Sequence, residues 1–193
     1  MNNLRNFEEN KIDLSKFNAK KGLERESSML KEALWYIFKI LFFLSPLPFP
    51  SNFKCVLLRI FGSKIGEGVI IKPRVNIHFP WKLEIGSHVW IGEEVFILNF
   101  ERLVIEDHVC VSQRAFLCGG NHDFSKFDFA YRNGPITLKK GCWVGASVFV
   151  APCTIFENYA VATAGSVVSG VLMDKTIYSG NPAQEVKERL FKK

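Results

Sequence analysis

A six-residue repeat of aliphatic residues constrains this chain more than any other feature of its sequence. Three successive triplets begin at positions 65, 85 and 105, so each unit holds three hexads and a two-residue extension: Ile65, Ile71 and Ile77; Ile85, Ile91 and Ile97; Ile105, Val111 and Leu117. After one interruption the spacing resumes without slippage at Leu138, Val144, Val150, Phe156, Ala162 and Val168. A period of six fits neither the 3.6 residues of a helical turn nor the period of two of a lone strand. It predicts a solenoid, with a β-sandwich as the alternative.

In such a solenoid each hexad forms one short strand and one corner, and three hexads close a triangular coil. Neighbouring coils would stack ~4.8 Å apart, the usual spacing of hydrogen-bonded strands, with the aliphatic residues in an internal column. A second inward position, four residues after each aliphatic one, holds mostly small or β-branched side chains: Val69, Val75, Val89, Val95, Val109, Ala115, Cys142, Val148, Thr154, Ala160 and Ser166. Glycine directly follows the aliphatic residue at positions 66, 86, 92 and 145, where a tight corner favours a residue that tolerates unusual dihedral angles.

This pattern divides the chain into three parts. Residues 1–64 form a polar arm and a helical cap, residues 65–178 form the solenoid with an inserted loop at 119–137, and residues 179–193 form a C-terminal helix. The cap helix would begin at Ser27 or Ser28 and end near Leu44, before prolines 46, 48 and 50. Its apolar positions are Leu30, Leu34, Ile37, Leu41 and Leu44.

The C-terminal helix is predicted from Asn181 and Pro182, which resemble a helix start, and would run to about Leu190. It would close the open end of the solenoid, where strand edges are otherwise unpaired.

Charge and cysteine content narrow the class of protein. The net charge of +6 forms no dense basic stripe, which argues against a nucleic-acid partner. Five cysteines, an odd number without a C-x-x-C pair, disfavour a disulfide framework and a zinc ribbon and indicate buried thiols. The N-terminal residues lack the apolar stretch of a signal peptide. We therefore expect a cytoplasmic protein.

Several motifs carry a family resemblance. The hexads IGEEVF at 91–96 and VGASVF at 144–149 resemble those of the hexapeptide-repeat acyltransferases, which are built on a left-handed parallel β-helix. Other motifs resemble the colanic-acid-type acetyltransferase subgroup: LLRIFG at 57–62, IKPR at 71–74, PW at 80–81, VWIGE at 89–93, SQ at 112–113, LC at 117–118, HD at 122–123, PI at 135–136 and GNPA at 180–183. The hexads specify only the fold, whereas the loop and the C-terminal motif specify the family.

This resemblance implies an O-acetyltransferase that moves acetyl from acetyl-CoA to a hydroxyl of a sugar or glycan precursor in surface-polysaccharide synthesis. Acetyl-CoA would be a co-substrate, and no metal is expected. A homotrimer is implied as well, because the family is trimeric and an active-site loop without an enclosing pocket needs a neighbouring subunit. Another small hydroxyl acceptor is the alternative within the same chemistry.

The loop at 119–137 is the predicted place of the reaction, because a repeat protein gains no stability by interrupting its ladder. The resemblance makes His122 the catalytic base. An alcohol must lose its proton as it attacks a thioester, and an imidazole titrates near neutral pH and can take that proton. Asp123 or a backbone carbonyl would hold the other ring nitrogen and fix the tautomer. The alternative is a loop histidine that only packs or is solvated.

Three residues are candidates for substrate binding. The family has a substrate-binding asparagine near Asn99, which lies one coil below the loop; a structural asparagine is the alternative. Trp81 and Trp90 would form a wall on which a sugar stacks, unless they only pack at the corners of the coils.

The resemblance assigns the acetyl-CoA site to four residues whose small side chains let the pantetheine arm lie between two solenoids: Ala146, Ala164, Gly165 and Ser169. Lys187 and Arg189 would meet the phosphates of the cofactor, the alternative being solvated charges on the C-terminal helix. Family members often have a lysine directly after the Ser169 position, where this chain has Gly170.

Two other functions are compatible with a hexapeptide solenoid. A γ-class carbonic anhydrase binds zinc through three histidines, and His88 and His108 occupy the same outward position of adjacent coils, one repeat unit apart. Zinc needs three or four close ligands, and the sequence offers at most two. A non-catalytic β-helix protein is the other alternative, against which the intact His122-Asp123 pair argues.

Residues 33–64 are a candidate for a peripheral membrane contact. This segment is rich in aromatic residues and carries four basic side chains and no acidic one: Lys39, Lys54, Arg59 and Lys64. Its apolar core at 33–44 is shorter than the ~20 residues that span a bilayer, but an amphipathic helix can lie in the membrane interface. The same face can instead cap the solenoid, and both roles are compatible if one face packs and the other stays exposed. Attachment would place the protein at the inner face of the plasma membrane.

Overall fold

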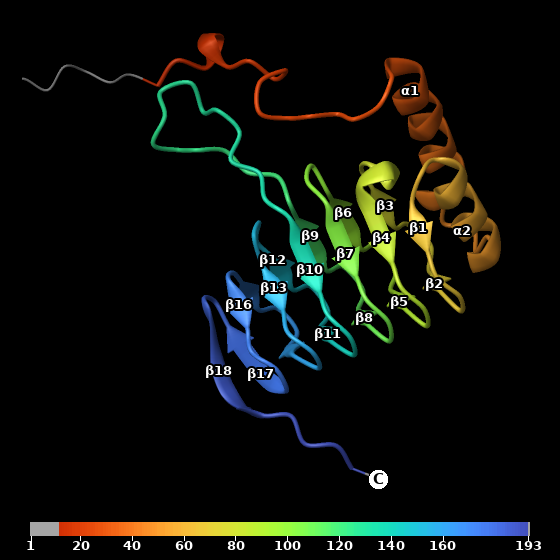
Figure 1. The fold of residues 1–193 in the computed structure, drawn as a ribbon, viewed down its shortest axis with the longest axis vertical. Helices are drawn as coiled ribbons and strands as arrows, with labels where there is room; N and C mark the ends of the chain where they lie inside the picture. The colour runs from red at the N-terminus through yellow and green to blue at the C-terminus, as the bar shows by residue number, and fades with distance from the viewer. Residues whose placement is uncertain (1–11, 193) are drawn as a thin grey trace, which may run out of the picture.

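The computed structural model describes residues 12–192, and its centre is a stack of triangular β-coils (Figure 1). One sheet contains β1 (Lys64–Ile65), β4 (Leu83–Ile85), β7 (Leu103–Ile105), β10 (Ile136–Leu138), β13 (Ile155–Phe156) and β16 (Val171–Leu172). The second contains β2 (Ile70–Ile71), β5 (Trp90–Ile91), β8 (Cys110–Val111), β11 (Trp143–Val144), β14 (Val161–Ala162), β17 (Thr176–Gly180) and β18 (Ala183–Glu188). The third contains β3 (Asn76–Ile77), β6 (Phe96–Leu98), β9 (Phe116–Cys118), β12 (Phe149–Val150) and β15 (Val167–Val168). Successive coils add parallel strands to each sheet, which confirms the predicted parallel β-solenoid.

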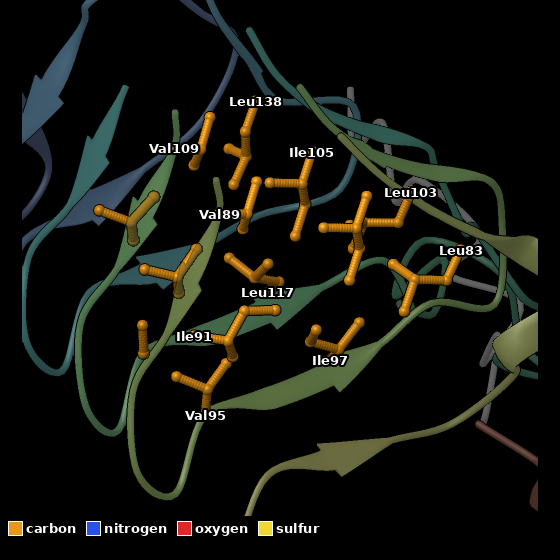
Figure 2. Packing of buried hydrophobic residues seen from close by; sticks show 14 of the residues in the cluster. Leu83, Val89, Ile91, Val95, Ile97, Leu103, Ile105, Val109, Leu117 and Leu138 are labelled. Atoms are coloured by element: carbon orange, nitrogen blue, oxygen red, sulfur yellow. The ribbon is translucent and has the colours of Figure 1, made fainter. Parts of the chain in front are cut away.

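The register of the strands follows the sequence period. Ile85 pairs with Ile65 on one side and with Ile105 on the other, so each partner lies one repeat unit away along the chain. Beyond the loop the coil shortens, and Leu138 pairs with Phe156, three hexads further along. Aliphatic side chains from all three sheets meet in the interior, as Figure 2 shows for Ile105, Ile91 and Ile97. Both predicted series of inward positions beyond Ile65 are buried, because a triangular coil this narrow leaves no space for water.

The corner glycines serve a different purpose from the one expected. The glycines at 66, 86, 92 and 145 are not among the residues with positive φ. A Cβ atom at Gly92 would lie 2.6 Å from the backbone nitrogen of Gln113 in the next coil, and one at Gly66 would lie 2.6 Å from the carbonyl carbon of Gly86. These corners need glycine because adjacent coils approach closely there. Positive φ falls later in each turn, at residues such as Glu94 and Arg114.

Two helices cover the N-terminal end of the solenoid (Figure 1). The first, α1 (Met29–Phe38), begins after Ser28, whose side chain accepts a hydrogen bond from the Lys31 backbone nitrogen, and continues into a π-helical turn, η2 (Lys39–Phe43). This confirms the predicted cap helix. The second, α2 (Ser51–Ile60), begins directly after Pro50 and was not predicted. Short 3-10 turns occupy η1 (Leu14–Lys16) and η3 (Pro80–Lys82). Within residues 12–192 no helix has the length and apolar character needed to cross a membrane.

The two faces of α1 and η2 are both apolar. Trp35 and Phe43 are buried against the first coil, where the Trp35 indole nitrogen donates to the carbonyls of Ile77 and His78 at 3.1 and 3.0 Å. Four of the five apolar positions expected from helical spacing point outward instead and are 43–70% exposed: Leu30, Leu34, Ile37 and Leu41.

The four basic residues of this segment do not form an outward-facing group, contrary to expectation. Lys39 and Lys54 are buried. The Arg59 guanidinium donates to the Ile65 and Gly66 carbonyls at 2.9 Å, and Lys64 pairs with a glutamate at 3.0 Å. A membrane contact of this segment would therefore depend on its apolar face and not on these charges.

The predicted C-terminal helix at 179–193 is wrong. Strands β17 and β18 form an antiparallel hairpin whose turn is Asn181-Pro182, and no part of residues 179–192 is helical. β17 continues the parallel sheet and leaves one edge unpaired, so backbone pairing with β18 satisfies that edge directly. The hydrogen bonds gained by pairing with the β17 edge outweigh the weak helical preference of residues 183–188.

Candidate active site

The loop that interrupts the coils leaves the solenoid after β9 and returns at β10 (Figure 1). Its two limbs are joined by an isolated antiparallel bridge between His122 and Tyr131 and by hydrogen bonds from Asp123 N to Ala130 O and from Arg132 N to Asn121 O, both 2.8 Å. The insertion expected at 119–137 is thus present as a two-limbed projection, with a defined backbone that can position a side chain.

The N-terminal arm lies along this loop. Asp13 N donates to the Phe127 carbonyl at 2.8 Å, and the Asn133 side chain donates to the Gly22 carbonyl at 3.1 Å. The Phe17 ring packs against the rings of His122 and Tyr131, with centroids 5.3 and 5.2 Å away. The expected surface arm is therefore present over residues 12–25, and it supports one side of the predicted catalytic histidine.

His122 is exposed and its ring is held in one orientation. Nδ1 lies 2.5 Å from the backbone carbonyl oxygen of Phe129, and Tyr131 packs on the ring with centroids 5.0 Å apart. A carbonyl can only accept, so Nδ1 carries a hydrogen and donates to Phe129. The neutral ring then has its lone pair on Nε2. Such a nitrogen can accept a proton from a hydroxyl group placed beside it.

Asp123 does not take the position beside the histidine ring. Its carboxylate accepts from the Ser125 backbone nitrogen at 3.1 Å and from the Ser125 hydroxyl at 2.5 Å. These hydrogen bonds, chiefly the one from the hydroxyl, lower the pKa of Asp123. Of the two groups expected to hold the second ring nitrogen, the structure brings the backbone carbonyl into place, and Asp123 closes a local turn instead.

Asn99 is a structural asparagine. It is fully buried, its Oδ1 accepts from Phe79 N at 2.9 Å, and its Nδ2 donates to Phe79 O at 2.6 Å. Both ends of the amide are thus occupied by the corner of the coil below. The expected substrate contact of Asn99 is wrong, because a substrate cannot reach a fully buried side chain whose amide is already bonded at both ends.

The two tryptophans do not form one wall. Trp81 lies in η3, where it stacks on Phe79 with centroids 5.0 Å apart and donates from its indole nitrogen to the Arg25 carbonyl. Trp90 lies in β5, on the second sheet, and is 42% exposed beneath the ammonium of Lys72. A shared sugar-stacking surface is therefore excluded, and Trp81 packs as a corner residue.

Three of the four residues assigned to acetyl-CoA lie together. Ala146 and Ala164 occupy equivalent corners of adjacent coils, and Gly165 N donates to the Ala146 carbonyl at 2.8 Å. Gly165 has a φ of +73° and open space where a Cβ would point. This corner presents no bulky side chain, so it fits a narrow linear ligand. Ser169 is exposed at the next corner, between β15 and β16.

The two basic residues assigned to the phosphates differ in their availability. The Arg189 guanidinium donates to the carbonyls of Gly141 and Tyr159 at 2.8 and 3.0 Å, which fastens the C-terminal segment to the coils. Both hydrogen bonds come from Nη1 and occupy neither Nε nor Nη2, so the phosphate role of Arg189 stays a prediction. Lys187 lies exposed on β18 opposite Ile177 and remains a candidate.

Sequence reasoning missed the two rings that contact the histidine, and it named a backbone carbonyl without saying which residue supplies it. Phe17 and Tyr131 contact its ring, and the carbonyl of Phe129 accepts a hydrogen bond from its Nδ1. The aromatic residues that recur through the loop were a usable signal for the packing contacts. A backbone carbonyl has no residue-type signature, so no signal could have identified the Phe129 contact.

Histidine and cysteine side chains elsewhere do not assemble a metal site in residues 12–192, where no three metal-ligating groups come together. His88 and His108 stack with centroids 5.2 Å apart. The cysteines are all free; burial raises the pKa of Cys142 to about 12, whereas Cys153 is exposed, unlike the buried thiols expected.

Comparison with known proteins places this geometry in context. The putative colanic acid biosynthesis acetyltransferase WcaF of Escherichia coli K12 is 35% identical over 178 residues, which cover 92% of this chain and 97% of that protein. A galactoside acetyltransferase in complex with coenzyme A superposes with a TM-score of 0.73 at 20% identity, covering 83% of this chain and 82% of that one. The Vibrio cholerae acetyltransferase VCA0836, complexed with acetyl coenzyme A, gives 0.75 at 20% identity, with 84% and 88% covered. No family model matches the chain.

A parallel β-solenoid with a histidine on a loop that interrupts one coil defines an acyltransferase of the hexapeptide-repeat class. The solved structures support this at the level of fold alone. The extensive similarity to the Escherichia coli protein goes further, and the chain belongs to the colanic-acid-type acetyltransferases of the hexapeptide-repeat family.

Proposed function

We propose that this enzyme transfers an acetyl group from acetyl-CoA to a hydroxyl group of a sugar, with His122 as the general base. The Nδ1 hydrogen bond to Phe129 carries the proposal, because it leaves Nε2 free to accept a proton. Nε2 takes the hydroxyl proton as the sugar oxygen attacks the thioester carbonyl carbon. The new C–O bond forms, the C–S bond breaks, and the proton passes to the departing thiolate. The thioester is already activated, so no covalent enzyme intermediate is needed.

Acetyl-CoA would lie along the corner formed by Ala146, Ala164 and Gly165 and reach the exposed Ser169 and Lys187. The absence of large side chains at this corner supports the placement. Two neighbours in the structural comparison are described with coenzyme A or acetyl coenzyme A bound. Substitution of Gly165 by Val would fill the open space and introduce strain at a positive φ. We expect this variant to bind CoA more weakly in calorimetry while its unfolding remains cooperative.

The acceptor is a sugar of a surface polysaccharide or of its precursor. The relative with 35% identity is named for colanic acid biosynthesis, and a second one is named for lipopolysaccharide biosynthesis. The direct test is release of CoA thiol from acetyl-CoA with a panel of sugar acceptors, followed by mass spectrometry of the producing organism's polysaccharide with and without the gene. Loss of an O-acetyl group in the deletion strain is the expected result. A lack of thiol release with every acceptor in the panel, together with an unchanged polysaccharide, would refute it.

The active site is completed in a homotrimer. The loop carries His122 outward, away from the coils of its own chain, and its ring is exposed on the side not covered by Phe17 and Tyr131. Three copies related by a threefold axis would place each loop against a neighbour in equivalent interfaces that close as a ring. Light scattering should give three times the 22.0 kDa of one chain. A fully active monomer would contradict this.

The helical cap also contacts the inner surface of the plasma membrane. The outward face of α1 and η2 is formed by large apolar side chains without a charge among them: Met29, Leu30, Leu34, Tyr36, Ile37, Ile40 and Leu41. An exposed surface of this kind marks an interaction site with a protein or a membrane. Parallel solenoids in a trimer would turn their three caps to the same side, which suits a flat lipid surface.

Liposome co-sedimentation tests this contact. Wild type should bind vesicles with little dependence on salt, because apolar insertion and not charge attraction carries the contact. Ile37→Glu should abolish binding by placing a charge in the middle of the face. Val186→Glu, on the exposed side of the C-terminal hairpin, is the matched control and should bind like wild type. Equal sedimentation of Ile37→Glu and wild type would show that the face is only a cap.

A further inference from the structure

A groove of about 860 Å³ opens between α1, the N-terminal arm and the corner before β4, and the reaction proposed above does not use it. Its walls are largely aromatic and include Trp35, Tyr36, Phe79 and Trp81. Trp35 and Trp81 are each fixed by an indole hydrogen bond to a backbone carbonyl. Two of the groove walls are therefore fixed by hydrogen bonds of the protein itself, and the aromatic lining can hold an apolar chain.

Lys39 lines this groove and lacks a counter-ion. Three lysines of the described chain are at least nine-tenths buried, and the other two have acceptors. Lys54 donates to the carbonyls of Ile71 and Lys72, and Lys82 donates to Phe100 O at 2.8 Å and pairs with Glu26. Lys39 as a whole residue is 7% exposed, but its ammonium is not among the buried unpaired atoms; it reaches the groove, faces the Tyr36 ring at 5.2 Å and has no hydrogen bond or ion pair among residues 12–192. Because this ammonium lies at the groove surface without a counter-ion on residues 12–192, an anion in the groove can bind it directly.

The other charged groups of the groove favour an anion as well. Lys20, Arg25, Lys39 and Glu32 line it, which makes three basic groups and one acid, and Glu32 is paired with Arg25. Burial, together with the charges of Lys39 and Arg25, lowers the pKa of His78 to about 4, so this histidine is neutral at physiological pH. The field in the groove is therefore positive.

The groove is continuous with the apolar outward face of the cap. Met29, Ala33 and Tyr36 line the groove and are also exposed on α1. An apolar chain could thus pass from the lipid surface into the groove without crossing charged protein surface. An anion beside Lys39 and an apolar chain along α1 together describe an amphiphile with a phosphate group.

We infer that the groove binds the lipid-phosphate part of a lipid-linked acceptor, with the phosphate at Lys39 and the prenyl chain directed along α1 toward the membrane. This inference rests on the proposed function, and it assigns the acceptor to the lipid-linked class. A lysine ammonium and a phosphate form charge-assisted hydrogen bonds, and Lys39 presents its ammonium to the groove. The aromatic lining accommodates the chain.

The position of the groove relative to His122 agrees with this assignment. Phe79 in the groove wall contacts Phe100 with ring centroids 6.0 Å apart, Phe100 contacts Tyr131 at 5.8 Å, and Tyr131 contacts the His122 ring at 5.0 Å. These rings form a continuous aromatic path from the groove to the base. A short glycan attached to the phosphate can follow this path and present a hydroxyl to Nε2.

Calorimetric titration of the full chain with farnesyl phosphate, a short prenyl phosphate, tests the site. Wild type should bind it. Farnesol, which lacks the phosphate, and inorganic phosphate, which lacks the prenyl chain, should both bind at least tenfold more weakly. Lys39→Met should lower the affinity for farnesyl phosphate roughly tenfold or more, since a hydrogen bond to a charged group contributes that much binding free energy. Ala33→Trp should have the same effect by filling the groove from an exposed position. Lys64→Met removes a charge from the same end of the solenoid outside the groove and should bind like wild type.

Several results would overturn the inference. Equal binding of farnesyl phosphate by wild type, Lys39→Met and Ala33→Trp would do so, as would tighter binding of UDP, which would make the acceptor nucleotide-linked. Tighter binding of dihexanoyl phosphatidylglycerol would assign the groove to a bilayer lipid instead. Failure of the proposed function would look different, since wild type would then release no CoA with any acceptor whatever its affinity for farnesyl phosphate. Thermal unfolding of each variant shows that it is folded.

Discussion

In the coils, aliphatic side chains such as Ile97 stack in an interior without solvent, whereas the loop at 119–135 is held by backbone hydrogen bonds and by rings that remain partly exposed. Phe124 and Phe127 of the loop are among the most exposed aromatic residues of the described chain. Each coil is thus stabilised by its neighbours, while the loop depends on the N-terminal arm and its own turns. Stability and chemistry are located in different parts of the molecule, and substitutions should separate them.

The largest effect is expected from His122→Ala in the loop. Turnover should fall by about 10²–10⁴-fold, the usual contribution of a general base, while the melting temperature and CoA affinity stay as in wild type. Steady-state thiol-release kinetics at saturating substrates give the comparison. Near-normal turnover would remove His122 from the reaction.

The opposite outcome is expected from Ile97→Ala in the coil below the loop. Removal of a fully buried aliphatic side chain costs about 2–5 kcal/mol of unfolding free energy, because the rigid solenoid cannot collapse around the cavity. Denaturant unfolding measures that loss. Turnover per folded molecule should remain close to that of wild type at a temperature where both proteins are folded. A loss of turnover as large as that of His122→Ala would contradict the separation of stability in the coils from chemistry in the loop.

His78, where the arm and the coils meet, should couple stability to pH. Its pKa is about 4 in the folded protein against 6.5 for a free histidine, so between these values the unfolded chain holds a proton that the folded one lacks. Stability should therefore fall as the pH drops from 6.5 toward 4, by at most about 3 kcal/mol, less the screening of a partly exposed ring. Urea unfolding across this range, with His78→Gln as the reference, measures the contribution. An identical pH dependence in both proteins would be inconsistent with a neutral, half-buried His78.

The smallest effect is expected from Asp123→Asn. The carboxylate bonds to Ser125 and not to the histidine, so turnover should change less than about threefold if the carbonyl of Phe129 alone orients the ring. A loss of the size seen when the orienting carboxylate of a catalytic triad is removed, about 10⁴-fold, would restore Asp123 to the role first expected of it. The pH profile of turnover should keep the same shape in both proteins.

The coils could be predicted from sequence because the signal for them is repeated: one misplaced aliphatic residue leaves the period visible in all the others. The two ends of the solenoid have no such redundancy. Residues 183–188 carry a mixture of residue types that suits a helix as well as a strand, and the free edge of β17 decides between them. Likewise α2 is only ten residues long and has Lys54 among its buried positions, so its apolar pattern is a weak signal, and the open end of the first coil selects the helical form.

The candidate site shows the same limit. His122 was identified because its residue type and its place in an insertion both indicate chemistry. Asn99 and Arg189 have suitable residue types as well, but Asn99 bonds the backbone of Phe79 and Nη1 of Arg189 bonds the backbone of Gly141. Sequence shows that a polar side chain is present and does not show whether its donors and acceptors are already taken. Only the three-dimensional arrangement of the corners answers that question.

The number of coils that precede the loop has a consequence for acceptor length. Three coils, from β1 to β9, lie between the helical cap and the point where the loop departs. At the usual strand spacing they set the catalytic histidine roughly 10–15 Å above the cap. A solenoid can gain or lose only whole coils without breaking its ladder, so this height changes in fixed steps. The distance between the cap and His122 would then select which sugar along a tethered glycan meets the base.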